Sequence, residues 1–272
     1  MRRRAAELGL NGDEVLSEYP GHLAEAARDA GDRLLVVVGG DGTMNEVVNG
    51  AAQTNAEIAI LPNGTGQDFG RSHAIPTGFD DAVRVALGGK TRTIDVGRVV
   101  LGDKTRYFAN VGSAGMSGSV ARRANSMSKA LGGRATFFYA LTREFLAWQN
   151  TEVTVRLDDG EEQRGAMHDV IVAIGQWHGG GMKLAPEARQ DDGLFDVVFI
   201  GDVNKVDFLT TAPKLYNGKY LAHPKVDHVR SATVAIDAAE PLPVEVDGES
   251  IGTTPARFEV VPAALRLRVP AA

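Results

Sequence analysis

The sequence LLVVVGGDGT, residues 34–43, joins a short apolar run to a glycine-rich turn. An apolar run of this length without polar alternation is typical of a strand buried in a parallel sheet. Residues 44–52 follow it with a pattern that predicts a helix. The same order begins again where the apolar strand 58–61 leads into the turn 62–68. Strand, glycine-rich turn and helix in succession predict an open α/β sheet.

The pattern changes near residue 90, where short strands separated by Gly, Pro and Asp turns become frequent. The strands predicted beyond that point are 94–101, 106–110, 153–157, 170–174, 195–200, 233–237, 242–246, 257–260 and 265–269. Strands of this length and spacing are typical of β-rich domains. We therefore expect an α/β domain over residues 1–92 and a β-rich domain over residues 93–272.

The composition excludes several classes of protein. The chain has 272 residues, no cysteine and a formal net charge of −6. Without cysteine there is no disulfide scaffold, thiol nucleophile or thiolate metal site. The acidic balance disfavours a nucleic-acid partner. The longest apolar runs, such as 34–38 and 170–174, are too short to span a bilayer, so a cytoplasmic protein is expected.

The first glycine-rich turn has the features of a phosphate site. Gly39, Gly40 and Gly42 allow the backbone to approach an anion because glycine has no Cβ atom. The N-terminus of the following helix favours negative charge at the same place. Asp41 can hold a Mg²⁺ ion that is bound to the phosphate. A purely structural turn is the alternative, and the position between strand and helix favours the phosphate site.

The second turn, residues 62–69, also follows a predicted buried strand. Turns after neighbouring strands lie at the same edge of an open α/β sheet, where such folds bind ligands. Thr65 offers a hydroxyl group to a phosphate, and Asp68 adds a second carboxylate. The alternative is that Asp68 only caps the following turn.

Two acidic segments in the second half have less specific patterns. Residues 244–249, Val-Glu-Val-Asp-Gly-Glu, contain Asp247-Gly248, which is a common hairpin turn. The pair Asp191-Asp192 can chelate a hard cation with the help of backbone carbonyl groups. A solvated turn is the alternative interpretation of the aspartate pair.

Taken together, these segments resemble the diacylglycerol kinase catalytic family of soluble bacterial lipid kinases, which are relatives of sphingosine kinases. Their joint occurrence in this order is more specific than any single motif. The matching motifs are GGDGTMNEVVNG at 39–50, LPNGTGQDFGR at 61–71, DDGLFD at 191–196, HPKV at 223–226 and VDGE at 246–249. The resemblance covers the chain from Ser17 onward.

The resemblance implies an N-terminal α/β domain similar to those of NAD kinases and phosphofructokinases, followed by a C-terminal β-sandwich domain that contacts the lipid. It implies ATP as co-substrate and Mg²⁺ as cofactor, with Asp41 and Asp68 beside the nucleotide's metal and phosphates. Glu249 matches the proposed general base of the family. The positions that match nucleotide contacts are Ser17, Gly39, Gly40, Asp41, Gly42, Thr43, Asn45 and Thr65. A second, structural Mg²⁺ would be held by the Asp192 carboxylate and the backbone oxygens of Arg189 and Leu194.

The implied reaction transfers the γ-phosphoryl group of ATP to the hydroxyl group of a lipid. Diacylglycerol is the expected substrate and phosphatidate the expected product. The lipid would be met at the membrane surface, on the cytoplasmic side, and a homodimer is the assembly that the resemblance implies.

The sequence departs from the family pattern in two places. Gln67 stands where family members usually have asparagine. The strand and the Asn-Pro…Ser-Gly turn that usually open the family do not precede Ser17, so we expect an N-terminal domain without its first strand. Two alternatives remain open: an NAD kinase-like enzyme, and a truncated, inactive module that binds lipid or nucleotide.

Overall fold

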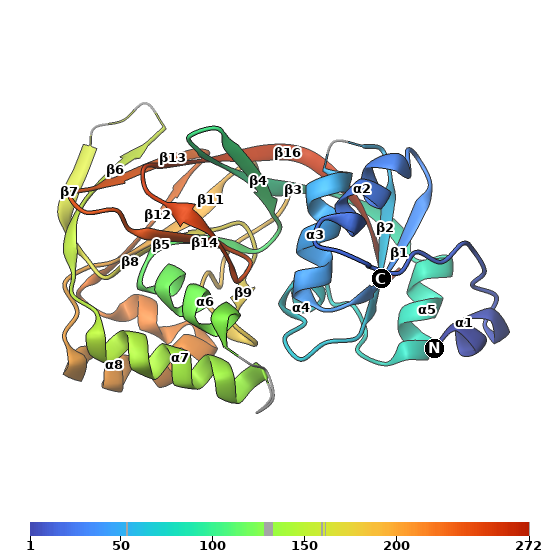
Figure 1. Ribbon diagram of the computed structural model, residues 1–272, viewed down its shortest axis with the longest axis horizontal. Coiled ribbons are helices and arrows are strands. Elements are labelled where there is room, and N and C mark those ends of the chain that lie inside the picture. The colour runs from blue at the N-terminus through green and yellow to red at the C-terminus, as the bar shows by residue number, and fades with distance from the viewer. Residues whose placement is uncertain (53, 128–132, 159, 161, 272) are drawn as a thin grey trace.

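The computed structural model describes residues 1–52, 54–127, 133–158, 160 and 162–271, without the side chains of 133–138. Figure 1 shows two lobes, an N-terminal lobe of strands and helices and a C-terminal lobe of two layered sheets. The mixed α/β fold that the sequence predicts is therefore confirmed.

The N-terminal lobe has helices on both sides of a parallel sheet. Its elements are α1 (Arg2–Glu7), α2 (His22–Asp29), β1 (Leu34–Gly39), α3 (Asp41–Ala51), β2 (Glu57–Pro62), α4 (Asp68–Ser72) and α5 (Phe79–Gly88). Strands β1 and β2 pair in parallel along their whole length. Because side chains alternate across a strand, Ile58 and Ile60 of β2 pack towards α2 and α3, whereas Ala59 and Leu61 pack towards α5.

Gly50 determines how closely α2 and α3 approach each other. A Cβ atom at position 50 would lie 2.0 Å from the backbone oxygen of Ala24. The backbone of α2 cannot move aside as a flexible side chain could. Gly50→Ala is therefore expected to lower the free energy of unfolding by about 2 kcal/mol, measured by denaturant titration. Gly88→Ala in α5 is the matched control, because a Cβ atom there meets nothing within 4 Å. Similar losses in both variants would contradict the packing argument.

The C-terminal lobe is a sandwich of two sheets. One sheet contains β3 (Lys90–Leu101), β4 (Lys104–Phe108), β6 (Thr151–Leu157), β7 (Glu162–Met167), β13 (Thr233–Ala238) and β16 (Ala256–Val269). The other contains, in spatial order, β12 (Val226–Ser231), β11 (Phe195–Ile200), β8 (Asp169–Ala173), β5 (Val111–Gly115), β14 (Pro243–Val246) and β15 (Glu249–Thr253). The buried rings of Phe108, Phe195 and Phe258 pack together in the core between the two sheets.

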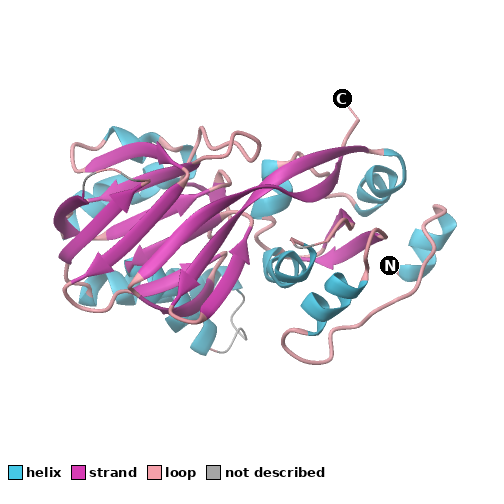
Figure 2. Cartoon of the chain, turned by 90° about the horizontal axis from the view of Figure 1, so that it is seen from above, coloured by secondary structure: helices cyan, strands magenta, loops and turns pink. Residues whose placement is uncertain are grey.

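Strand β16 takes part in both lobes. The sequence predicts two strands, 257–260 and 265–269, but the structure joins them into one strand with a pairing irregularity between Val261 and Leu265. The end of β16 pairs in parallel with β2, where Leu267 lies opposite Ile58. Figure 2 shows this strand running from one lobe into the other. The division at residues 92 and 93 stays a prediction, and β16 returns to the N-terminal sheet beyond it.

Helices and short strands cover the outer face of the second sheet (Figure 1). They are α6 (Met116–Ser126), α7 (Gly133–Ala147), β9 (Trp177–His178), β10 (Met182–Lys183), α8 (Lys205–Thr211) and the 3₁₀ helices η2 (Ala212–Asn217) and η3 (Lys219–Ala222). None of the described helices is long and apolar enough to cross a membrane.

Candidate active site

The two glycine-rich turns touch each other at the ends of β1 and β2. The backbone N–H of Asn63 donates to the carbonyl oxygen of Gly39 at 2.8 Å. A Cβ atom on Gly64 would lie 2.7 Å from the Cα atom of Gly40, so no side chain fits between the turns. The two glycines therefore leave exposed backbone beside the N-terminus of α3, which is the environment that a phosphate group prefers.

Asp41 is the first residue of α3 and faces the second turn. Its Oδ1 atom accepts a hydrogen bond from the backbone N–H of Phe69 at 3.1 Å. Its Oδ2 atom points to Gly66, where a Cβ atom would come within 2.4 Å. Burial raises the pKa of Asp41, and the carboxylates of Asp68 and Asp247 raise it further. Carboxylates this close to one another favour the binding of a cation, which can also bind a phosphate group.

Asp68 connects the second turn to the C-terminal lobe. Its Oδ1 atom pairs with the guanidinium group of Arg71 at 2.6 Å, and its Oδ2 atom accepts the backbone N–H of Gly180 at 2.7 Å. The guanidinium group of Arg71 also lies 5.1 Å from the ring centre of Trp177. These contacts hold the loop 177–181 against the turn. The Asp68 side chain makes no capping hydrogen bond to α4, whose N-cap residue is Gln67, so the capping alternative is wrong.

Asp247 forms a second connection between the lobes. Its carboxylate accepts hydrogen bonds from the backbone N–H groups of Ala109, Asn110 and Val111 at 2.8–3.0 Å. It also accepts one at 3.2 Å from the side chain of Asn45, which lies on α3. The hairpin between β14 and β15 is thereby fixed beside the first helix turn of the phosphate site.

A cavity of about 950 Å³ extends from the turns into the C-terminal lobe. Its lining at the turns and at the β14–β15 hairpin consists of Gly40, Asp41, Gly42, Thr65, Asp68, Asp247 and Gly248. Its apolar lining includes Met116, Val120, Leu141, Ile171, Met182, Leu184, Ile200, Phe208 and Leu215. Strands β8 and β11 line it on the sheet side, and α6, α7, α8 and η2 line it on the helix side. One continuous cavity thus joins a phosphate-type site to an apolar chamber.

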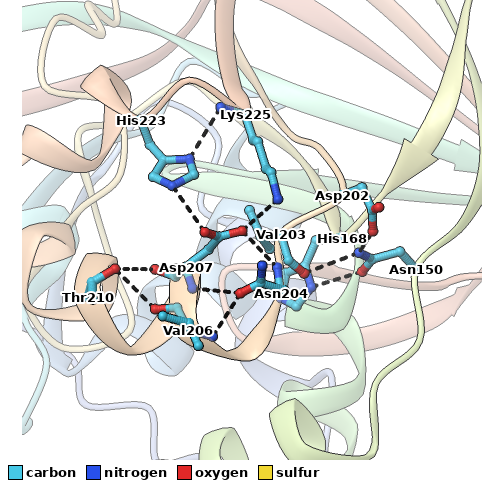
Figure 3. A network of polar contacts seen from close by, with 10 residues as sticks. All are labelled: Asn150, His168, Asp202, Val203, Asn204, Val206, Asp207, Thr210, His223 and Lys225. Carbon is cyan, nitrogen blue, oxygen red and sulfur yellow. Dashed lines mark hydrogen bonds and ion pairs between the residues drawn. The ribbon is translucent and has the colours of Figure 1, made fainter.

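A polar network fixes α8, which lines this cavity (Figure 3). Asn204 caps the helix by accepting the backbone N–H groups of Val206 and Asp207 at 2.9 Å. The Asp207 carboxylate pairs with Lys225 at 2.6 Å and lies 3.8 Å from His223. The motif at 223–226 therefore anchors the first turn of α8, which forms part of the cavity wall.

The predicted site residues occupy three kinds of position. Gly40, Asp41, Gly42, Thr65 and Asp68 line the cavity together. Gly39, Thr43 and Asn45 lie behind them: Thr43 fills the space above Gly39, and Asn45 holds Asp247. Ser17 and Glu249 are exposed and are not among the residues that line the cavity.

The predicted structural cation site contains an ion pair. The Asp192 carboxylate pairs with Arg230 at 2.6 Å, and its other oxygen accepts the backbone N–H of Leu194 at 3.2 Å. A cation held there by Asp192 with the backbone oxygens of Arg189 and Leu194 would have to compete with this guanidinium group, so the site stays a prediction. In the part of the chain that the structure describes, no three His, Asp or Glu side chains form a metal-binding group.

Three residues at the site have no role assigned to them in the sequence analysis: His178, Glu245 and Asp247. Asp247 belongs to a segment that also predicts an ordinary hairpin turn. Glu245 is fully buried between the apolar residues Val244 and Val246, and this charged residue within a core strand is the clearest sequence indication among the three.

Comparisons with known proteins agree with this architecture. A family model described as the diacylglycerol kinase catalytic domain matches residues 1–99. A model described as the YegS C-terminal NAD kinase beta sandwich-like domain matches residues 110–269. The diacylglycerol kinase of Staphylococcus carnosus (strain TM300) is 34% identical over 228 residues, which cover 83% of this chain and 72% of that protein.

Two solved structures share the fold. A diacylglycerol kinase from Bacillus anthracis str. Sterne superposes with a TM-score of 0.69 at 20% identity, covering 94% of this chain and 84% of that chain. An NAD kinase from Archaeoglobus fulgidus in complex with ATP has a TM-score of 0.55 at 14% identity, covering 98% and 87%. The domain matches and the sequence identity to curated relatives lead to one conclusion: the chain belongs to the diacylglycerol kinase family.

Proposed function

We propose that this chain transfers the γ-phosphoryl group of ATP to the hydroxyl group of a lipid, with diacylglycerol as substrate and phosphatidate as product. The observation that supports this most strongly is the continuity of the cavity. It begins at two backbone-lined turns suited to phosphate and ends in an apolar chamber suited to hydrocarbon chains. The curated relatives carry the name diacylglycerol kinase, which agrees with this substrate.

The donor set at the turns fits Mg²⁺. The ion prefers carboxylate oxygens and usually keeps several water or phosphate ligands, so one or two protein carboxylates suffice. Asp41 would hold it, with Asp68 close by, and the raised pKa of Asp41 indicates a site that favours added positive charge. Bound there, the ion would neutralise negative charge on the phosphates. The two turns would orient the triphosphate through their backbone N–H groups, and the apolar chamber would exclude water from the lipid end.

Glu249 is our proposed general base for the lipid hydroxyl. It is exposed and directly follows Asp247 and Gly248, which both line the cavity. Glu249→Gln is expected to lower kcat about 10²-fold without changing the melting temperature, because only the proton acceptor is removed. Glu152→Gln, at an exposed position on β6, is the matched control. Full lipid phosphorylation by Glu249→Gln would exclude Glu249 as the base.

The exposed apolar side chains of α7, α8 and η2 form our proposed contact with the lipid surface. Val206 and Leu209 on α8 are 68% and 70% exposed, and Tyr139, Leu146 and Tyr216 are also more than half exposed. The same three elements line the apolar chamber, so a lipid bilayer in contact with them would be next to the path of its own lipid.

Replacing Val206 and Leu209 together with serine is expected to weaken binding to anionic phospholipid vesicles about tenfold in sedimentation, because apolar area that enters the bilayer is lost. Activity on a dispersed short-chain diacylglycerol is expected to persist. Leu16→Ser, at a position 69% exposed on the N-terminal lobe, is the control. Unchanged vesicle binding by the double variant would exclude α8 as the membrane contact.

An assay with γ-labelled ATP tests the proposed function. The protein is incubated with Mg²⁺, ATP and either dioleoylglycerol micelles or NAD, and the label is followed between chloroform and water. Label in a chloroform-soluble phosphatidate is the expected result, and it should require Mg²⁺. Label in NADP would favour NAD kinase chemistry, and ATP binding without any transfer would favour an inactive binding module.

The homodimer and the cytoplasmic location stay predictions, which sedimentation and cell fractionation can test.

A further inference from the structure

The cavity contains a marked excess of negative charge. Of the described side chains that line it, none belongs to lysine or arginine. The lining carboxylates are Asp41, Asp68, Asp169, Asp207 and Asp247. Arg71 pairs with Asp68 and Lys225 with Asp207 from outside the lining, which leaves three of the five without an ion pair to a described lysine or arginine. A triphosphate that enters adds further negative charge, and the Mg²⁺ proposed above offsets only part of it. A cationic group from the protein itself is therefore needed near the transferring phosphoryl group.

His178 is the lining residue placed to supply that charge. It belongs to the loop 177–181, which the contacts of Gly180 with Asp68 and of Trp177 with Arg71 hold against the second turn. A Cβ atom on Gly66 would lie 3.8 Å from the Cα atom of Gly180, so this loop lies directly beside the phosphate-type turns. The side chain of His178 is only 12% exposed.

Glu245 holds the imidazole ring from the sheet side. Its Oε1 atom lies 3.5 Å from Nε2 of His178, and it also accepts the hydroxyl group of Ser113 at 3.0 Å. Its Oε2 atom accepts the backbone N–H of Gly248 at 2.8 Å. A carboxylate that is 0% exposed is costly unless a cation accompanies it, and His178 is the neighbour that forms an ion pair with it. With Nε2 towards Glu245, the Nδ1–H group remains for a ligand.

The surroundings favour the protonated ring. Burial acts to lower the pKa of His178, but Glu245, Asp68, Asp247 and Asp41 outweigh burial and raise it above the ordinary value. Asp169 lies close enough to interact as well. Arg71 and Lys183 both lie against the ring of the neighbouring Trp177, at 5.1 and 5.3 Å from its centre.

We infer that His178, positioned by Glu245, is a catalytic residue that donates a hydrogen bond as an imidazolium to the transferring γ-phosphoryl group. The inference rests on the proposed function. In the step, the lipid hydroxyl oxygen forms a bond to the γ-phosphorus while the bond from that phosphorus to the β–γ bridging oxygen breaks. The electron pair leaves with ADP, the hydroxyl proton passes to Glu249, and His178 keeps its own proton while it neutralises charge on the phosphoryl oxygens.

Nucleotide binding separates this role from a structural one. His178→Gln is expected to weaken AMP-PNP binding about tenfold in calorimetry and to leave ADP binding unchanged, because only the γ-phosphate contacts the ring. His228→Gln is the matched control, since His228 pairs with the fully buried Asp196 at 2.7 Å but does not line the cavity. Equal losses for ADP and AMP-PNP would overturn the inference and leave the proposed function intact. Failure of the wild type to bind either nucleotide would overturn both.

The pH dependence of kcat supplies the second test. The imidazolium form is the active one, so kcat of the wild type is expected to fall as the pH rises through the pKa of His178. Glu245→Gln should move this fall to lower pH, and His178→Lys should move it to higher pH with partial activity. A fall that stays at the same pH in Glu245→Gln and His178→Lys would contradict the assignment, and these two variants keep the test valid if His178→Gln does not fold.

Discussion

The Asp41→Asn variant is expected to lose lipid phosphorylation by a factor on the order of 10³ and to fold as the wild type does. Asp41 lies at the N-terminus of α3, where the two turns meet, and is our proposed ligand of the Mg²⁺ that accompanies ATP. Its pKa is raised by burial and by the nearby Asp68 and Asp247, so the ionised carboxylate reduces folded-state stability near neutral pH. A neutral amide removes this repulsion while it removes the charge that the reaction needs.

The melting temperature of Asp41→Asn is therefore expected to match or exceed that of the wild type while the activity disappears. Asp81→Asn is the matched control, because Asp81 lies in the first turn of α5, is exposed and is remote from the cavity. Activity within threefold of the wild type in Asp41→Asn would remove Asp41 from the metal and phosphate site.

The Asp247→Ala variant is expected to lose about 3 kcal/mol of unfolding free energy and nearly all activity. The carboxylate accepts the N–H groups of three successive residues, 109–111, and the side chain of Asn45. Its removal leaves these donors without their acceptor and releases the β14–β15 hairpin from α3. The loss of activity follows because Gly248 and the adjacent Glu249 no longer hold their positions beside the first turn.

Asp247→Asn should show a smaller loss of stability, since one carbonyl oxygen still accepts hydrogen bonds. Glu240→Ala, at an exposed position in the same lobe, is the control. Denaturant unfolding gives the free energies, and a stability of Asp247→Ala equal to that of Glu240→Ala would show that the connection between the lobes is not significant.

The sequence is sufficient to predict the phosphate-type half of the site. Apolar strands and glycine-rich turns are local patterns, and parallel pairing of the two strands brings the turns to one edge. The burial expected for the first strand is wrong in part: β1 lies at the edge of the sheet, where Leu34 and Val38 are exposed, whereas β2 is buried. The contact between Gly40 and Gly64 and the meeting of Asp41 with Asp68 follow from that geometry. Gln67 takes the left-handed backbone conformation, with φ of 56°, and its side chain donates to the carbonyl oxygen of Gly64 at 3.0 Å, so the turn accommodates this departure from asparagine.

The half of the site that lies in the C-terminal lobe could not be predicted in this way, because it depends on contacts between residues far apart in the chain. Asn45 and Asp247 are separated by 202 positions, and no local pattern indicates their hydrogen bond. The same holds for His178 on β9 and Glu245 on β14, whose side chains approach to 3.5 Å only in the folded chain. Strand β16 is also longer than its pattern suggests, because the proline and small residues at 262–264 form an irregular stretch within it instead of ending it.

The central claim is that one cavity holds the triphosphate at the two turns and the lipid in the apolar chamber. A crystal structure with Mg²⁺, AMP-PNP and a short-chain diacylglycerol tests it most directly. The account predicts the γ-phosphorus between turns 39–43 and 62–68, with the lipid hydroxyl oxygen roughly 3.5 Å away and the acyl chains between α6, α7 and α8. A nucleotide bound away from both turns, or a lipid bound outside the cavity, would contradict it.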